Sequence, residues 1–302
     1  MSRVPAVSIG LPTFNRAAGL RRAAESVLAQ TWDDLELVIS DNASDDETQA
    51  ACAELARRDD RVRVVRHETN VGAEANFRCA LEQATGTFFM WLADDDWLDA
   101  GTVAACAQRL IERPDHSLVC AVSRYFRDDE LAFVERPVDL LQSSARGRVL
   151  GFYRTVTLNG PFYGLMRRQE LLRIPPLQSS VGADWLLVAS IASLGKVVTL
   201  REVAINRSLG GVSKDEASLA RAYGLSSREA RNWQLLVARA AYRDIVHGAI
   251  FGEVPRSQRR LLGASAALLV AARFSGKVWL GHALQRLGLF EPARAVLERR
   301  RR

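Results

Sequence analysis

The chain has 302 residues, of which 48% are hydrophobic and 25% charged, as expected for a globular protein with one large domain and an appendage. Its net charge of +6 is uneven: from Gly252 onward, 11 Lys and Arg stand against 3 Glu, which gives +8 and leaves −2 for the rest. A nucleic-acid-binding body would carry a basic face of its own, so we expect no nucleic acid as a partner.

The sequence predicts no membrane span, no secretory signal and no disulfide framework. It contains no uninterrupted run of 18 apolar residues, and its start lacks the basic and then apolar pattern of a signal peptide. The four cysteines lie far apart without a C-x-x-C pair, which favours reduced, buried thiols. We therefore expect a cytoplasmic protein.

Strand and helix patterns alternate through the first 125 residues. Short β-branched runs predict strands at 6–12, 35–41, 61–67, 88–94 and 117–123. Between them, the spacing of apolar residues predicts helices at 17–30, 45–58, 72–84 and 99–112. This order is typical of βαβ units, so we expect an α/β fold with a Rossmann-like, mostly parallel sheet flanked by helices.

The pattern changes after residue 125. A strand is predicted at 163–168, a helix at 183–195, and one or two strands at 196–209. From Lys214 onward the spacing is helical, with breaks expected at Gly252–Pro255, near Ser275–Gly276 and at Pro292. We therefore expect two domains, a body over 1–213 and a basic, amphipathic helical C-terminal region over 214–302.

The predicted strands of the first half end in polar residues, and ligands bind beyond the carboxyl ends of parallel strands. These ends read PTFNR (12–16), DNASDD (41–46), HETNVG (67–72) and ADDDW (93–97). The chain lacks the residues required for a glycine-rich dinucleotide turn, a P-loop or a calcium loop at these positions. The acidic end of the fourth strand is therefore the strongest candidate site.

Three consecutive carboxylates, Asp94, Asp95 and Asp96, follow that strand with no basic neighbour in the sequence. Such a group suits Mg²⁺ or Mn²⁺, which takes one or two carboxylates and completes its shell with water and substrate phosphate. Two structural alternatives stay open: a solvated acidic loop, and a helix start at which Asp96 and Asp99 complement the helix dipole.

Two linked stretches resemble the GT-A fold glycosyltransferases of family 2. They read VSIGLPTFNRAAGLRRAAESVLAQTWDDLELVISDNASDDET and TNVGAEANFRCALEQATGTFFMWLADDDWL, and weaker likeness continues through GADWLLVASIASLGK and NRSLGGVS. The resemblance implies a GT-A nucleotide-sugar-binding and catalytic domain over 1–213. It further implies an inverting, hexosyltransferase-type enzyme that uses Mn²⁺ or Mg²⁺. Its donor would be a UDP-, dTDP- or GDP-sugar, and its acceptor a hydroxyl of a glycan or a lipid-linked glycan, as in polysaccharide biosynthesis.

The resemblance also implies roles for residues of these stretches. The nucleotide-sugar would be bound by Pro12, Phe14, Asn15, Arg16, Asp41, Asn42, Gly72, Asn76, Asp94 and Asp95. Phe14 would lie against the base, Asp41 or Asn42 would bond its edge, and Asp94 would contact the ribose or a metal-bound water. Asp95 or Asp96 would bind the metal. Asn42 and Ala93 depart from the family, which more often has acids at both positions.

Displacement of a nucleotide by a hydroxyl needs a carboxylate to take the hydroxyl proton. The stretch GADWLL resembles the helix start at which the family carries this base, so Asp184 is the candidate. A first-turn acid that stabilises the helix is the structural alternative. The family's later histidine ligand is absent from NRSLGGVS, where Arg207 or Ser213 could reach phosphate instead.

Residues 255–302 interleave arginines with apolar side chains. This pattern suits helices on an anionic membrane surface, which would place the protein on the inner face of the cytoplasmic membrane. It equally suits a helical subdomain that packs on the body. Two other functions stay open: a nucleotidyltransferase or phosphodiesterase that adds Asp41, Asp45 and Asp46 to the acidic cluster, and an inactive nucleotide-sugar-binding scaffold.

Overall fold

The computed structural model describes residues 6–175, 180–209 and 216–286, and the chain divides into two compact units, Met1–Lys214 and Asp215–Arg302. The first unit carries all the strands of the described residues, and the second is helical there. The boundary of the two units lies one residue from that of the two expected domains.

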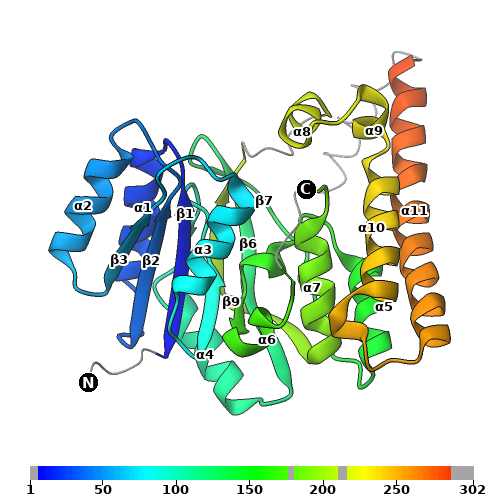
Figure 1. Ribbon diagram of the computed structural model, residues 1–302, viewed down its shortest axis with the longest axis horizontal. Helices are drawn as coiled ribbons and strands as arrows, with labels where there is room; N and C mark the ends of the chain where they lie inside the picture. Colours follow the sequence, from blue (N-terminus) through cyan, green and yellow to red (C-terminus); the bar gives the residue numbers. More distant parts are fainter. Residues whose placement is uncertain (1–5, 176–179, 210–215, 287–302) are drawn as a thin grey trace. The chain divides into compact units, whose positions relative to one another are not determined.

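The described strands of the first unit form one sheet (Figure 1). Its order is β3 (Val62–Arg66), β2 (Leu35–Asp41), β1 (Val7–Thr13), β4 (Phe88–Trp91), β8 (Leu165–Arg167), β6 (His116–Arg127), β9 (Lys196–Ser208) and β5 (Trp97–Leu98), with β7 (Glu130–Val134) paired to β6. Strands β1 to β4 run parallel, which confirms the expectation for the first half. β8 runs antiparallel to both β4 and β6, so the sheet as a whole is mixed.

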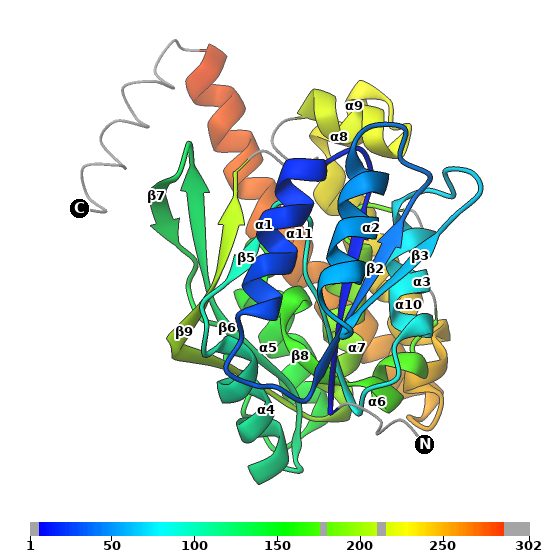
Figure 2. The same cartoon turned by 90° about the vertical axis from the view of Figure 1, so that its left-hand side faces the viewer.

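Helices cover both faces of this sheet. They are α1 (Ala17–Leu28), α2 (Thr48–Arg58), α3 (Ala73–Gln83), α4 (Thr102–Glu112), α5 (Ala145–Thr155), α6 (Arg168–Leu172) and α7 (Ala183–Leu194), with a 3-10 turn η1 (Gly160–Tyr163). Near β1, helices α1 and α2 lie on one face and α3 on the other (Figure 2). This arrangement is the doubly covered α/β layer expected from alternating strands and helices.

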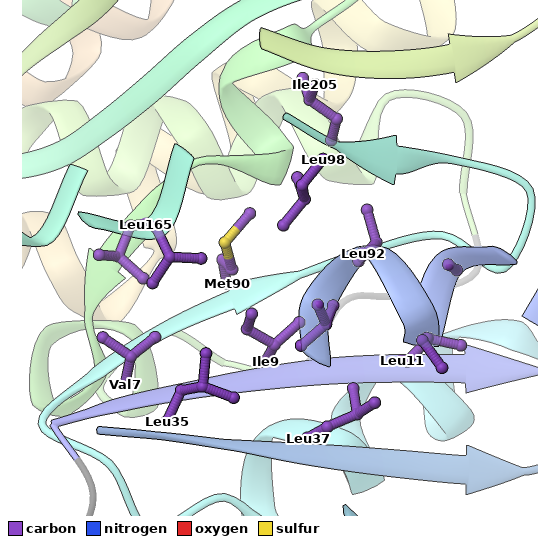
Figure 3. Packing of buried hydrophobic residues seen from close by; sticks show 14 of the residues in the cluster. Val7, Ile9, Leu11, Leu35, Leu37, Met90, Leu92, Leu98, Leu165 and Ile205 are labelled. Atoms are coloured by element: carbon purple, nitrogen blue, oxygen red, sulfur yellow. The ribbon is translucent and has the colours of Figure 1, made fainter. Parts of the chain in front are cut away.

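The main hydrophobic core lies on the α1 face. Alternate residues of β1, Val7, Ile9 and Leu11, pack there with Leu37 of β2 and Met90 of β4 (Figure 3). All five are fully buried or nearly so, as the period of two predicts for a strand that presents one face to this core.

The opposite face of β1 admits α3 only because residue 10 is glycine. A Cβ atom at Gly10 would lie 2.6 Å from the Phe89 ring and 3.0 Å from the Cβ of Ala80. The missing side chain therefore leaves room for the Phe89 ring of β4 and for Ala80 of α3 on this face of β1.

Strand β4 ends at Trp91, earlier than the predicted strand 88–94. The Asp96 amide donates to the Ala93 carbonyl at 3.1 Å, so the chain turns at the carboxylates and re-enters the sheet as β5. In this unit, the sequence analysis did not predict β5, β7, α5, α6 or the turn η1. Residues 196–208 form a single strand, β9, whose register against β6 shifts between Ala121 and Val122.

The described part of the second unit contains α8 (Glu216–Tyr223), α9 (Ser227–Arg231), α10 (Trp233–His247), a 3-10 turn η2 (Ala249–Phe251) and α11 (Arg256–Arg286). The break expected near Ser275–Gly276 is wrong, because α11 is continuous, and Pro292 lies outside the described residues. None of the helices described here is both long and apolar enough to cross a membrane.

Candidate active site

The carboxyl ends of β1, β2 and β4 meet at one edge of the sheet because these strands run parallel. The stretch that follows β1 is tied to the stretch that follows β2 by a reciprocal pair of bonds. Asn15 Nδ2 donates to Asp45 Oδ1 at 2.6 Å, and the Asp45 amide donates to Asn15 Oδ1 at 2.9 Å. Asn15 has a φ of 51°, a left-handed conformation that asparagine tolerates. This turn presents Phe14, 45% exposed, at the edge.

Two of the three consecutive carboxylates converge on Arg16. Its Nη1 atom lies 3.2 Å from Asp94 Oδ1 and 2.6 Å from Asp95 Oδ2. The other oxygen of Asp94, Oδ2, accepts a bond of 2.8 Å from the Thr13 hydroxyl. Burial raises the pKa of Asp94, whereas Arg16 and Thr13 act to lower it. The ends of β1 and β4 are thus joined through charge and hydrogen bonds.

Asp96 turns away from this pair and is 3% exposed. Its carboxylate accepts from Arg207 Nε and from the Ser208 amide, both at 3.1 Å, at the end of β9. Burial raises the pKa of Asp96 to about 6, although the positive charge of Arg207 opposes that rise. The oxygens of Asp96 are therefore already bonded, and its role as a metal ligand stays a prediction.

Asp41 and Asn42 lie at the end of β2, both buried and both bonded to neighbouring loops. Arg66 pairs with Asp41, and the Ser44 amide donates to Asp41 Oδ1 at 3.1 Å. The Asn42 side chain donates to Asn70 Oδ1 at 3.0 Å and accepts from the Val71 amide at 2.8 Å. These bonds fix the loop that leads into α3.

Gly72 and Asn76 occupy the start of α3, beside the same edge. Gly72 has a φ of +87°, which glycine adopts without strain, and it precedes the first residue of the helix. Asn76 is buried and accepts from the Ser40 hydroxyl at 2.6 Å, while its amide donates to the Thr13 carbonyl at 3.3 Å. Pro12 lies within β1, buried next to Thr13. The bonds of Asn76 thus link the start of α3 to the ends of β1 and β2.

Asp184 lies in the first turn of α7 and is only partly covered. Its Oδ2 atom accepts a bond of 2.8 Å from Asn159 Nδ2. Burial raises the pKa of Asp184, and the bond from Asn159 is the strongest influence that lowers it. A carboxylate with a raised pKa in a helix start can serve both expected roles, a proton acceptor and a first-turn acid.

The Tyr163 hydroxyl feels the charges of both Asp184 and the acidic strand end. Burial raises its pKa, and the carboxylates of Asp95, Asp96 and Asp184 all act in the same direction. The Arg207 guanidinium lies 4.4 Å from the centre of the Tyr163 ring. Asp184 and the three consecutive aspartates therefore share one electrostatic neighbourhood, although about 90 residues separate them in the sequence.

Several residues of this neighbourhood were not identified from the sequence. They are Thr13, Arg66, Asn159 and Tyr163, together with Tyr125, whose hydroxyl accepts from Arg207, and Glu135, which accepts from that hydroxyl. Asn159 alone had a local signal, because the run Asn-Gly-Pro at 159–161 indicates a turn. Ser213, the other residue expected to reach phosphate, lies outside the described residues.

The acids required for a two-metal nucleotidyltransferase have other partners. Asp45 bonds Asn15, and Asp46 accepts from the Thr48 amide at 2.8 Å at the start of α2. Asp41 is paired with Arg66. The placement of these acids gives no support to that alternative function.

Comparison with known proteins agrees with the geometry. The family described as Glycosyl transferase family 2 matches residues 8–172, more than half of the chain. A curated relative, the GalNAc(5)-diNAcBac-PP-undecaprenol beta-1,3-glucosyltransferase of Campylobacter jejuni, is 34% identical over 114 residues, which make up 37% of each chain. The chain thus spans well under two thirds of the length of that relative.

Solved structures extend the likeness to nearly the whole chain. Residues 1–349 of S. aureus TarS in complex with UDP-GlcNAc match with a TM-score of 0.57 and 17% identity, over 98% of this chain and 91% of that one. The mannosyltransferase PcManGT of Pyrobaculum calidifontis, in complex with GDP-Man and Mn²⁺, matches with 0.55 and 20%, over 97% and 83%. At these identities the likeness shows the fold.

Proposed function

The chain belongs to glycosyltransferase family 2 and is a glycosyltransferase with the GT-A fold, and on this premise we propose that it transfers a sugar from a nucleotide-sugar to a hydroxyl group with inversion of the anomeric carbon. The observation that carries the proposal is the convergence of Asp94 and Asp95 on one cationic nitrogen at the carboxyl edge of the sheet. A metal-bound diphosphate would require carboxylates at such a place.

The donor set at this point fits a hard divalent cation. Two carboxylate oxygens of adjacent residues already surround one positive group, and Mg²⁺ or Mn²⁺ commonly takes one or two carboxylates. Among the described residues, no group of three His, Cys, Asp or Glu side chains is arranged to hold a metal. Because Asp94 and Asp95 face the same cationic nitrogen, we assign the ion to Asp95 with Asp94, and expect substrate phosphate and water to complete its shell. The bound ion would neutralise charge on the leaving nucleoside diphosphate.

The nucleotide would lie on the loops that follow β1 and β2. Phe14 offers an exposed ring for stacking against the base, and Asp41 and Asn42 remain the candidates for its edge. Gly72 would let the backbone approach the nucleotide closely, since it carries no side chain. Arg16 would be released from the carboxylates when the cation binds, and its guanidinium would then be free to pair with a phosphate oxygen.

Asp184 would act as the base. Its carboxylate would take the proton of the acceptor hydroxyl while that oxygen attacks the anomeric carbon, and the carbon–oxygen bond to the diphosphate would break on the opposite face. A single displacement of this kind inverts the anomeric centre. Burial favours this role because it raises the pKa of the carboxyl and so makes the ionised form a stronger base.

A glycan or lipid-linked glycan is the acceptor that we propose. The Campylobacter relative is named for a substrate linked to undecaprenol diphosphate, and exposed arginines at the start of α11 would suit an anionic membrane surface. The reaction would then take place at the inner face of the cytoplasmic membrane, through a peripheral contact of residues 255–302.

Thermal unfolding with UDP, GDP and dTDP, each with and without Mn²⁺, tests the proposal. We expect one nucleotide to stabilise the protein in a Mn²⁺-dependent way, by about 2.7 kcal/mol at 100 times its Kd or roughly 5–10 °C. Asp95→Asn should lose the Mn²⁺-dependent part of this shift. Asp60→Asn, an exposed aspartate before β3 at the other edge of the sheet, should keep it. Stabilisation that is the same without metal, or absent with all three nucleotides, would contradict the proposal.

A further inference from the structure

We propose that Asn159 is a positioning residue for the Asp184 base, held in place by a buried clamp that Glu135 forms around it. The inference rests on the proposed function, because it assumes that Asp184 takes the acceptor proton. Neither Asn159 nor Glu135 belongs to the motifs that carry the family resemblance.

The bond between the two side chains has only one chemically sensible direction. An ionised carboxylate accepts but cannot donate, so the amide of Asn159 must face Asp184 Oδ2, at 2.8 Å. Asn159 is 1% exposed, and its Oδ1 atom has no hydrogen-bond partner among the described residues. A buried acceptor without a partner destabilises the fold. A buried amide that served stability alone would be expected to have hydrogen-bond partners for both its nitrogen and its oxygen.

Glu135 fixes the backbone on both sides of Asn159. Its Oε1 atom accepts from the Thr157 hydroxyl at 2.7 Å and from the Leu158 amide at 2.9 Å, and its Oε2 atom accepts from the Gly160 amide at 3.1 Å. Glu135 is itself buried, at 6% exposed. These bonds hold Asn159 at a φ of 57°, so the direction of its side chain is set by the clamp.

Gly160 is required for the clamp to close. A Cβ atom at this position would lie 2.6 Å from Glu135 Oε2. Only a residue without a side chain lets the carboxylate come within bonding distance of the Gly160 amide. The run Asn-Gly at 159–160 is therefore explained by two separate needs, a left-handed amide donor and a close carboxylate.

The clamp is continuous with the acidic strand end. Tyr125 donates from its hydroxyl to Glu135 Oε2 at 3.4 Å, and Arg207 Nη1 donates to the Tyr125 hydroxyl at 2.6 Å. Arg207 also binds Asp96, as described above. A chain of polar contacts thus runs from Asp96 through Arg207 and Tyr125 to Glu135, whose bonds flank Asn159. It would fix the position of the base relative to the acidic strand end.

The charges around Asp184 define what removal of the amide should do. Arg207 of β9 acts on its carboxylate, as do the amides of Asp184 and Trp185 at the start of α7, and Asp184 in turn raises the pKa of Tyr163 in η1. Arg148 of α5 binds the carbonyls of Ala192 and Ser193 at the other end of that helix. Because the Asn159 amide stabilises the ionised carboxylate, its loss should raise the pKa of the base and move the acidic limb of activity to higher pH.

Three substitutions separate the amide from the backbone conformation. Asn159→Gly removes the amide and tolerates a positive φ, Asn159→Ala removes it and strains the backbone, and Asn159→Asp keeps the shape but faces Asp184 with a second carboxylate. The readout is release of nucleoside diphosphate from UDP-, GDP- and dTDP-glucose with Mn²⁺ and water as acceptor, as a function of pH. Asp128→Gly, at an exposed left-handed position in the β6–β7 turn, is the matched control.

We expect Asn159→Gly to lower kcat at pH 7 at least tenfold, with an acidic limb displaced upward and the KM for the donor unchanged. Asn159→Asp should lose more at pH 7 and regain part of the loss at higher pH. Wild-type kcat and an unchanged acidic limb in Asn159→Gly would overturn the inference. Asp184→Asn separates failure of the proposed function from failure of this inference. If Asp184→Asn turns over the donor normally, the assignment of Asp184 as base is wrong. If Asp184→Asn is inactive while Asn159→Gly is fully active, only the role of Asn159 is wrong.

Discussion

Arg16 occupies the place that the proposed function gives to a divalent cation. Its guanidinium balances Asp94 and Asp95, and the two carboxylates in turn raise the pKa of Arg16 although burial acts to lower it. Two carboxylates on adjacent residues repel each other without such a partner. Arg16 therefore serves as an internal counter-charge that a metal and a diphosphate would replace.

If Arg16 is the counter-charge of Asp94 and Asp95, its removal should change how strongly Mn²⁺ stabilises the protein. Arg16→Gln should lower the melting temperature only slightly, by about 1–3 °C, because the pair is partly exposed and such pairs contribute about 0–1 kcal/mol. Mn²⁺ without nucleotide should then stabilise Arg16→Gln more than the wild type, since the two carboxylates lack a partner. Differential scanning fluorimetry over a Mn²⁺ titration measures both effects.

Arg57→Gln, an exposed arginine in the last turn of α2, is the control for loss of one positive charge. If Mn²⁺ stabilises Arg16→Gln, Arg57→Gln and the wild type to the same extent, Arg16 does not compete with the cation.

The roles of the three aspartates could be anticipated only in part. The family resemblance implied a division of roles, with Asp94 near the ribose or a metal-bound water and Asp95 or Asp96 on the metal. Which of them faces which partner could not be predicted, since Asp96 binds Arg207, 111 residues away in the chain. The same limit applies to Asn159, whose bond to Asp184 depends on a loop held by Glu135.

At the scale of elements, α11 continues through Ser275 and Gly276, where the sequence predicted a break. A glycine within a helix costs only about 1 kcal/mol relative to alanine, so the pair at 275–276 need not end the helix. α11 packs on α10, where a Cβ atom at Gly263 would lie 3.1 Å from the Tyr242 ring. Leu262, Ala266 and Val270 of α11 are buried. The opposite stripe leaves Leu261 and Leu268 55% and 69% exposed.

That exposed stripe of α11 predicts binding to anionic membranes. Arg256 and Arg260 are exposed beside Leu261, and each basic residue near a charged lipid surface contributes about 1 kcal/mol. The double variant Arg256→Glu, Arg260→Glu should therefore float with phosphatidylglycerol vesicles at least tenfold less than the wild type. Neither protein should float with neutral phosphatidylcholine vesicles.

A matched charge reversal on α2, Arg57→Glu with Arg58→Glu, controls for the change in net charge. If both double variants and the wild type are recovered equally with anionic vesicles, the membrane contact of this region is ruled out.

At the scale of the whole molecule, the sequence predicted the parallel half of the sheet and left the rest open. Alternating strands and helices identify β1 to β4 because each βαβ unit is local in sequence. The second half joins β8, β6 and β9 across long intervals, and β9 pairs with β6 through a register shift between Ala121 and Val122. Such pairing is set by tertiary contacts, and no periodicity within the strands reports it.

The site follows the same division. The proposed nucleotide side comes from the ends of the local βαβ units, and the family resemblance could name its candidate residues one by one. The proposed acceptor side draws on α7, η1 and β9, which are far apart in the sequence, and there the sequence offered only Asp184, through the family resemblance, and Arg207.

The central claim, metal-dependent sugar transfer with Asp184 as base, is tested most directly by donor turnover in Asp184→Asn. The donor is the nucleotide-sugar whose diphosphate gives the largest Mn²⁺-dependent stabilisation, and the measurement is release of that diphosphate together with the anomeric form of the released sugar. We expect the wild type to yield the inverted anomer, and Asp184→Asn to bind the donor equally well but turn it over about 10²–10⁴-fold more slowly. Undiminished turnover by Asp184→Asn, or a sugar released with retained configuration, would contradict the account.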